Sequence, residues 1–110
     1  MGWSLKEKAG KKRVLLELGG NAAVIIEPDA DLHVAAERCA AGGFSYSGQT
    51  CISVQRIYVH DAAHDAFLKL LLPLVESLPT GNPSDDATVI GPLITAVSYT
   101  HLTLPTIPLV

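Results

Sequence analysis

Apolar residues recur at helical spacing in three segments of the chain. Residues 3–9 have the pattern of the end of an amphipathic helix, which Gly10 stops. Residues 32–41 place a row of small and apolar side chains on one face, and this row predicts a second helix. Either Asp29 or Asp31 can cap the first turn of that helix.

A third helix is expected to start after residue 60, with Asp61 as its N-cap. Its core-facing stripe recurs at i, i+4, i+7 and i+11 and consists of Phe67, Leu71, Leu74 and Leu78. Pro73 lies inside this stripe and should kink the helix or split it. The Gly42-Gly43 pair is expected to break the second helix, or at least to weaken it.

Short apolar runs between these helices predict strands. Residues 13–18 form one run, which ends at Gly19-Gly20, and residues 54–60 form another. Residues 23–26 are continuously apolar, which is typical of a strand that is buried on both faces. Strands that alternate with helices indicate an α/β fold, with the strands in a layered sheet.

Composition narrows the classes of function. The 110 residues are 48% hydrophobic, which suits a packed domain, and their net charge is −3. This acidic balance argues against nucleic acid or an anionic membrane as the main partner. Residues 1–10 lack the apolar core of a signal peptide, so a cytoplasmic, reducing compartment is expected. Both cysteines are then expected to be free thiols.

Cys51 is the first candidate for chemistry, because a small and flexible Ser-Gly-Gln-Thr stretch precedes it. A cysteine acts as a nucleophile as the thiolate, in an accessible setting. The backbone N–H groups of Cys51 and Ile52 could stabilise an oxyanion if the turn aims them inward. The alternative is that Cys51 is a buried structural thiol. Cys39 lies on the apolar face of a predicted helix and is expected to be an inert core residue.

Glu17 is the second candidate, because it interrupts an apolar run just before a glycine pair. It could serve as a general base, or it could face solvent on an alternating strand. A pair of Cys51 with His60 or His64 as its base is a further alternative. No metal site is expected, because the cysteines and histidines lack the spacing of ligand pairs.

The sequences E-L-G-G-N at 17–21 and F-S-Y-S-G-Q-T-C at 44–51, taken together, resemble two motifs of the aldehyde dehydrogenase superfamily. The sequence E-L-G-G-N at 17–21 is similar to the motif that carries the catalytic glutamate of that family. The sequence F-S-Y-S-G-Q-T-C at 44–51 is similar to the motif that carries its nucleophilic cysteine. Glu17 and Cys51 stand 34 positions apart, as expected in that family. Three shorter stretches also match, namely P-D-A-D-L at 28–32, R-I-Y-V-H at 56–60 and G-P-L-I at 91–94.

The resemblance implies that an aldehyde is oxidised to a carboxylic acid with NAD+ or NADP+. The thiolate of Cys51 would attack the aldehyde, and a thioester would remain on Cys51 after hydride transfer. Glu17 would then activate the water that hydrolyses this thioester. The oxyanion would be held by the Cys51 backbone N–H and by an asparagine from an upstream segment.

The resemblance also assigns binding roles around these two residues. Leu18 and Gly19 would lie near the nicotinamide through backbone atoms. Thr50 and Ile52 would flank the pocket for the aldehyde. The partner is thus expected to be a small-molecule aldehyde, and the parent enzyme is expected to be a homo-oligomer.

The family's chains are several hundred residues long, so we expect this chain to be an internal fragment that is inactive by itself. Residues 1–20 would end the cofactor-binding domain, and residues 21–95 would start the catalytic domain. Residues 96–110 are expected to be a non-native tail, because the chain has no charged residue after Asp86 and the tail lacks the pattern of the preceding elements. The alternative to an enzyme is a non-catalytic α/β fragment or module with a structural thiol.

Overall fold

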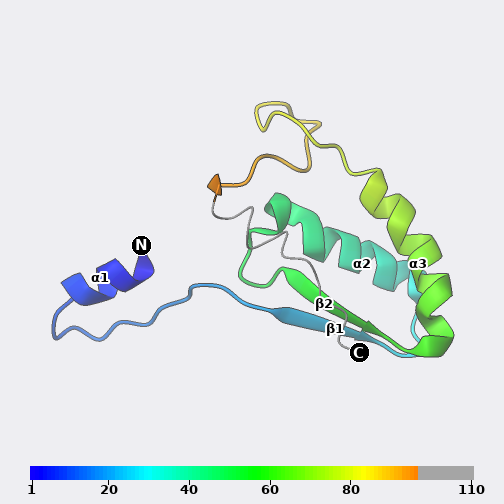
Figure 1. Ribbon diagram of the computed structural model, residues 1–110, viewed down its shortest axis with the longest axis horizontal. Helices are drawn as coiled ribbons and strands as arrows, with labels where there is room; N and C mark the ends of the chain where they lie inside the picture. Colours follow the sequence, from blue (N-terminus) through cyan, green and yellow to red (C-terminus); the bar gives the residue numbers. More distant parts are fainter. Residues whose placement is uncertain (97–110) are drawn as a thin grey trace.

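A computed structural model describes residues 1–96, and Figure 1 shows their arrangement. The short helix α1 (Gly2–Lys8) and an extended segment up to residue 21 project to one side of a packed body. The body follows in chain order as β1 (Ala22–Ile26), α2 (Leu32–Phe44), the 3-10 turn η1 (Ser45–Gly48), β2 (Val54–Val59) and α3 (Asp61–Glu76). Residues 77–96 then run back toward the end of α2. The predicted tail falls almost entirely outside the described residues.

The two strands pair in parallel and form a two-stranded sheet. Their register runs from Ala22 opposite Val54 to Ile26 opposite Val59, with one irregularity between Ala22 and Ala23. Helix α2 makes the crossover that a parallel pair requires. The predicted α/β fold with alternating strands and helices is therefore confirmed.

The core lies between the sheet and the helices α2 and α3, which cover the same side of the sheet in Figure 1. Its buried centre consists of Ile26, Ala36, Cys39 and Phe67. The other face of the sheet is open, since Ile25 is 71% exposed and Tyr58 is 52% exposed. The prediction that residues 23–26 are buried on both faces is wrong, because the described part of the chain supplies a helical layer on one side only.

Both long helices begin at a capping side chain. Asp31 caps α2, because its carboxylate accepts the backbone N–H groups of His33 at 3.0 Å and Val34 at 3.1 Å. The cap of α3 is His60, and the prediction that Asp61 would take this role is wrong. Asp61 instead lies in the first turn, where a negative charge favours the helix dipole.

Neither the glycine pair nor the proline interrupts a helix. Helix α2 continues through Gly42 and Gly43 to Phe44, which corrects the predicted break. A β-carbon at Gly42 would lie 3.0 Å from the Val54 side chain, so this glycine lets α2 approach β2 closely. Helix α3 does not split, because Pro73 lies in its last turn and little helix remains to be disrupted.

Residues 13–18 are not a strand, which corrects another prediction. They follow α1 as an extended segment, and Leu15 is 86% exposed. A strand requires a partner for its backbone hydrogen bonds, and none of the strands within residues 1–96 pairs with this segment. The apolar run therefore has strand character without a sheet to join.

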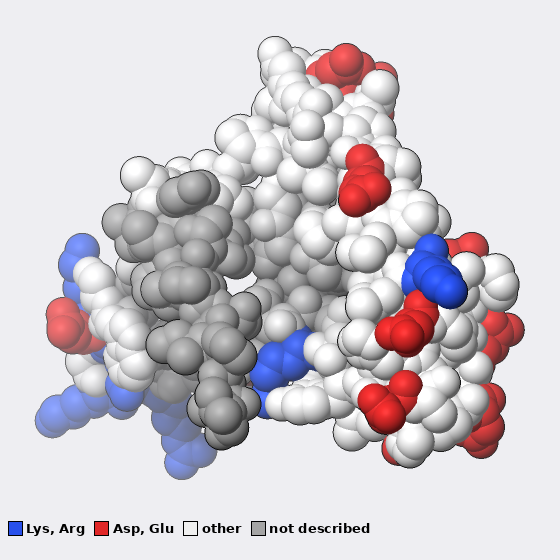
Figure 2. Space-filling model, turned by 45° about the vertical axis from the view of Figure 1, so that its right-hand side comes forward, with Lys and Arg blue, Asp and Glu red and all other residues white. Residues whose placement is uncertain are grey.

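Charge is divided between the two parts of the structure. Five of the eight basic residues lie in residues 6–13, whereas nine of the eleven acidic residues follow residue 26. Figure 2 accordingly shows most of the visible acidic side chains on the right and most of the visible basic side chains toward the left. The helical body is therefore acidic, and α1 with the segment after it is basic. In the described part of the chain, no helix is long and apolar enough to cross a membrane.

Candidate active site

The glutamate and cysteine motifs meet where the main chain of Gly20 packs against the carbonyl group of Cys51. A β-carbon at position 20 would overlap the Cys51 carbonyl oxygen and would lie 3.4 Å from the carbonyl carbon. Only a residue without a side chain fits there. Glu17 lies three residues before this contact, so the fold brings the segments that carry Glu17 and Cys51 together.

The chain that leads to Cys51 has an unusual backbone conformation. Tyr46, Ser47 and Gly48 have φ angles of 52°, 59° and 73° in succession. Residues other than glycine rarely adopt this left-handed conformation, and they keep it only where surrounding contacts hold them. Such local strain is common in functional loops.

Hydrogen bonds from two polar side chains hold this loop against residues 91–94. The Ser47 hydroxyl donates to the Gly91 carbonyl at 2.7 Å. The Gln49 side-chain oxygen accepts the backbone N–H of Ile94 at 2.8 Å, and its Nε2 donates to the Tyr46 carbonyl at 3.2 Å. The loop is thus attached to the G-P-L-I stretch, which lies more than 40 positions further along the chain.

Cys51 lies at the tip of a turn. The backbone N–H of Ser53 donates to the Thr50 carbonyl at 3.1 Å, and the buried Ser53 hydroxyl donates to the Gly43 carbonyl at 3.3 Å. Cys51 is an exposed free thiol, so the alternative that it is a buried structural thiol is wrong. This exposure allows a substrate to reach its sulfur atom.

Cys39 has the opposite environment. It is a free thiol that is 3% exposed in the core between α2 and its neighbours. Burial raises the pKa of the Cys39 thiol, which disfavours the reactive thiolate. The prediction that Cys39 is a core residue is confirmed.

The remaining predicted site residues lie close in sequence to Gly20 or Cys51, the two residues that are in contact. Leu18 is 57% exposed, and Gly19 has open space where a side chain would be. Thr50 is half-buried, and Ile52 is 78% exposed beside Cys51. Glu17 lies on the exposed segment that precedes them. The structure therefore places all these residues within or next to the two segments that meet.

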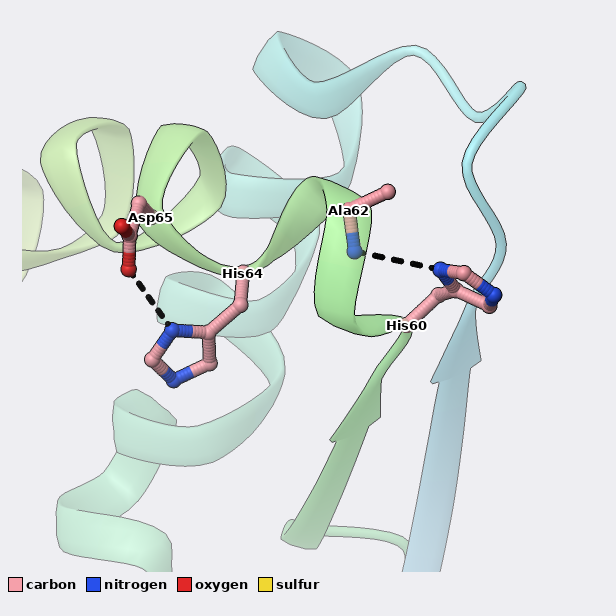
Figure 3. A network of polar contacts seen from close by, with 4 residues as sticks. All are labelled: His60, Ala62, His64 and Asp65. Atoms are coloured by element: carbon pink, nitrogen blue, oxygen red, sulfur yellow. Dashed lines mark hydrogen bonds and ion pairs between the residues drawn. The ribbon is translucent and has the colours of Figure 1, made fainter.

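The two histidines that were considered as a base for Cys51, His60 and His64, are not part of this arrangement. The His60 ring accepts the Ala62 backbone N–H at 3.2 Å, and the His64 ring lies 3.0 Å from the Asp65 carboxylate; the dashed lines in Figure 3 mark both interactions. Both rings follow the end of β2, whereas Cys51 precedes its start. The six residues of β2 separate them by about 20 Å, at roughly 3.3 Å per residue. The pair of Cys51 with His60 or His64 is therefore not assembled.

Two features of the site went beyond the sequence-based predictions. Ser47 and Gln49 form hydrogen bonds that attach the cysteine loop to residues 91–94. The only sign of this role in the sequence is that both residues lie inside the cysteine motif. Arg56 donates to the Asn21 carbonyl at 2.9 Å and to the Tyr58 hydroxyl at 3.1 Å. Because Asn21 ends the glutamate motif, Arg56 attaches that motif to β2.

An open groove of about 700 Å³ lies beside the cysteine loop. One wall comes from the loop and the other from the segment between Pro83 and Ile94. Within residues 1–96, no group of three or more His, Cys, Asp or Glu side chains could hold a metal ion.

Comparison with known protein families gives the same family as the two sequence motifs. A family model described as "Aldehyde dehydrogenase family" matches residues 1–103. The chain belongs to the aldehyde dehydrogenase family. This match extends past residue 96, where the non-native tail was predicted to begin, and the origin of the tail stays a prediction.

Individual members of the aldehyde dehydrogenase family resemble the chain over most of its length. A 3-sulfolactaldehyde dehydrogenase of Priestia aryabhattai is 48% identical over 94 residues, which are 86% of this chain and 20% of that protein. The succinate-semialdehyde dehydrogenase [NADP(+)] GabD of Escherichia coli is 44% identical over 96 residues, again 86% of this chain and 20% of that protein. The chain thus spans about a fifth of the length of these relatives.

Solved structures of this family share the fold. A 3,6-anhydro-L-galactose dehydrogenase in complex with NAP matches 91% of this chain and 21% of its own, with a TM-score of 0.80 and 36% identity. Two other matched structures are those of an NADP-dependent glyceraldehyde-3-phosphate dehydrogenase of Bacillus halodurans complexed with NADP and of an NAD-dependent aldehyde dehydrogenase of Sinorhizobium meliloti. The extended segment, the parallel strands and the helices of this chain are therefore part of an aldehyde dehydrogenase fold.

Proposed function

We propose that this chain carries the nucleophile and the general base of an NAD(P)+-dependent aldehyde dehydrogenase. The observation that carries the proposal is the packing of Gly20 against Cys51, which joins the glutamate segment to an exposed cysteine. Cys51 is the nucleophile and Glu17 is the base. Because the chain spans a fifth of its relatives, the whole reaction needs parts that the described residues do not contain, and residues 1–110 by themselves are inactive.

The first half of the reaction takes place on the Cys51 sulfur. The thiolate adds to the aldehyde carbon and forms a carbon–sulfur bond, while the carbonyl electrons move to oxygen. The backbone N–H of Cys51 stabilises this oxyanion. When bound, NAD(P)+ supplies the acceptor for the hydride that leaves the same carbon. The acyl group then remains on Cys51 as a thioester.

The second half regenerates the thiol. The Glu17 carboxylate takes a proton from water, and the resulting hydroxide adds to the thioester carbon. The carbon–sulfur bond breaks, the carboxylic acid leaves, and Cys51 is free for another cycle. The position of Glu17, three residues before the Gly20–Cys51 contact, supports this role.

The residues beside Cys51 suit the binding of cofactor and substrate. The backbone at Leu18 and Gly19 is open, and the absence of a side chain at Gly19 leaves room for a flat nicotinamide ring. Thr50 and Ile52 flank the thiol and would contact the aldehyde side chain. The parent enzyme is proposed to be cytoplasmic, since a reducing compartment keeps Cys51 as a free thiol. It is also proposed to be a homo-oligomer, as the resemblance to the family implies.

A chimeric enzyme tests this function. Residues 2–95 replace the aligned segment of the Escherichia coli succinate-semialdehyde dehydrogenase, and NADPH formation from succinate semialdehyde is measured. The chimera should be active, and Cys51→Ser should lower kcat by about 10³-fold or more. Cys39→Ala is the matched control and should retain activity. Equal activity of the Cys51→Ser variant and the parent chimera would refute the proposal in favour of a non-catalytic module.

A further inference from the structure

We infer that Gln49 is a positioning residue that fixes the cysteine loop through the backbone N–H of Ile94. This inference rests on the proposed role of Cys51 as the nucleophile. Gln49 lies two residues before Cys51, and its side chain uses both of its polar ends. The oxygen accepts the Ile94 N–H at 2.8 Å, and the nitrogen donates to the Tyr46 carbonyl at 3.2 Å.

The position of these bonds explains why the loop needs them. Tyr46 and Ser47 both have left-handed backbone conformations, which a chain of non-glycine residues does not hold without external support. One bond of Gln49 ends on the strained residue Tyr46, and the other ends on a segment 45 positions away. Ser47 adds a second attachment to that segment through Gly91.

A fixed loop matters because attack by a thiolate depends on the direction of its sulfur atom. The loop between Gln49 and Ser53 turns tightly around Cys51. If Gln49 no longer holds Ile94, the turn and the Cys51 N–H shift together. Loss of reacting geometry lowers the rate of the chemical step more than it weakens the binding of substrate.

Two substitutions of Gln49 separate its bonds. Gln49→Met keeps the length of the side chain but removes the donor and the acceptor. Gln49→Glu keeps the oxygen that accepts the Ile94 N–H and loses the donor to Tyr46. Gln55→Met is the matched control, because Gln55 is an exposed glutamine on β2 outside the loop.

The first readout is steady-state kinetics in the chimeric enzyme. Gln49→Met should lower kcat by about 100-fold while KM for the aldehyde changes by less than about threefold. Gln49→Glu should recover part of this loss, because it keeps the bond to Ile94 and loses the bond to Tyr46, and Gln55→Met should equal the parent. Unchanged kcat in Gln49→Met, or equal losses in Gln49→Met and Gln49→Glu, would overturn the inference. An inactive parent chimera would instead count against the proposed function.

The second readout is amide hydrogen exchange in the 110-residue chain, which does not depend on activity. The Ile94 amide should exchange at least about tenfold faster in Gln49→Met than in the parent, and Gln49→Glu should keep its protection. Equal exchange of Ile94 in the parent and in Gln49→Met would show that the bond is absent. That result would overturn the inference whatever the kinetics.

Discussion

The main chain of Gly20 and the carbonyl oxygen of Cys51 are in direct contact, and this contact has no room for a side chain at position 20. Two motifs from distant parts of the sequence are thereby joined. Gly19, its neighbour, has open space around it. The two glycines of one motif therefore have different structural roles, and substitution can distinguish them.

Gly20→Ala should destabilise the chain, because the new methyl group overlaps the Cys51 carbonyl and the backbone must move. We expect the free energy of unfolding to fall by about 1–3 kcal/mol, as for other overpacked sites. Gly19→Ala is the control and should change it by less than about 0.5 kcal/mol. Urea denaturation of both variants measures the difference, and equal losses would contradict the contact.

The two thiols should differ in reactivity, because Cys51 is exposed and Cys39 is buried. Iodoacetamide should label Cys51 at least about tenfold faster than Cys39 in the folded chain at pH 8. In urea the two rates should become similar. Peptide mapping by mass spectrometry resolves both sites, and equally fast labelling of Cys39 in the folded chain would contradict its burial in the core.

The raised pKa of Cys39 predicts a loss of stability in alkali. The pKa of Cys39 is higher in the folded state than in the unfolded state. The contribution of its protonated thiol to the free energy of unfolding is therefore fully present below the unfolded-state pKa. It is lost as the pH rises through the folded-state pKa. Between about pH 8 and about pH 10, the free energy of unfolding of the parent should therefore fall more steeply than that of Cys39→Ala. Parallel pH profiles for the two proteins would contradict burial of the thiol.

Tyr46 should tolerate replacement only by residues that accept its left-handed backbone. Its side chain is 78% exposed, so substitution removes little packing. Tyr46→Asn should leave stability within about 0.5 kcal/mol, whereas the β-branched Tyr46→Val should lose about 1–2 kcal/mol. Thermal unfolding of both variants tests this order, and the reverse order would exclude the left-handed conformation.

His60 should matter for stability and not for the chemistry of Cys51. His60→Ala removes the cap of α3 and should lower the free energy of unfolding by about 1 kcal/mol. The alkylation rate of Cys51 should stay within twofold of the parent, because β2 lies between the two residues. A large fall in that rate would support the alternative in which His60 acts as the base for Cys51.

Local patterns in the sequence were enough to predict most of the body. The stripe on α3, the apolar face of α2 and the strand β2 all follow from spacing, since each buries its face against a neighbour within the chain. Residues 13–18 and the outer face of β1 show the limit of such patterns. Their apolar residues predict burial, but the described residues provide no layer or strand to bury them.

The site was predicted unevenly for a similar reason. Glu17 and Cys51 could be predicted, because their residue types and the motifs around them can be recognised in the sequence alone. The contact of Gly20 with Cys51 and the bonds of Ser47 and Gln49 depend on segments that only the fold brings together. The predicted break of α2 at Gly42 was wrong for the same reason. Tight packing of Gly42 against β2 is a tertiary effect that overrides its low helix propensity.

Trapping the acyl group on Cys51 tests the central claim most directly. In the chimeric enzyme with Glu17→Gln, the base that hydrolyses the thioester is missing, so a single burst of NADPH should be followed by accumulation of the acylated protein. Mass spectrometry should find Cys51 heavier by the mass of the aldehyde less two hydrogen atoms, and Cys39 unmodified. Undiminished turnover by Glu17→Gln, or an adduct on another residue, would contradict the assignment of Glu17 as base and Cys51 as nucleophile.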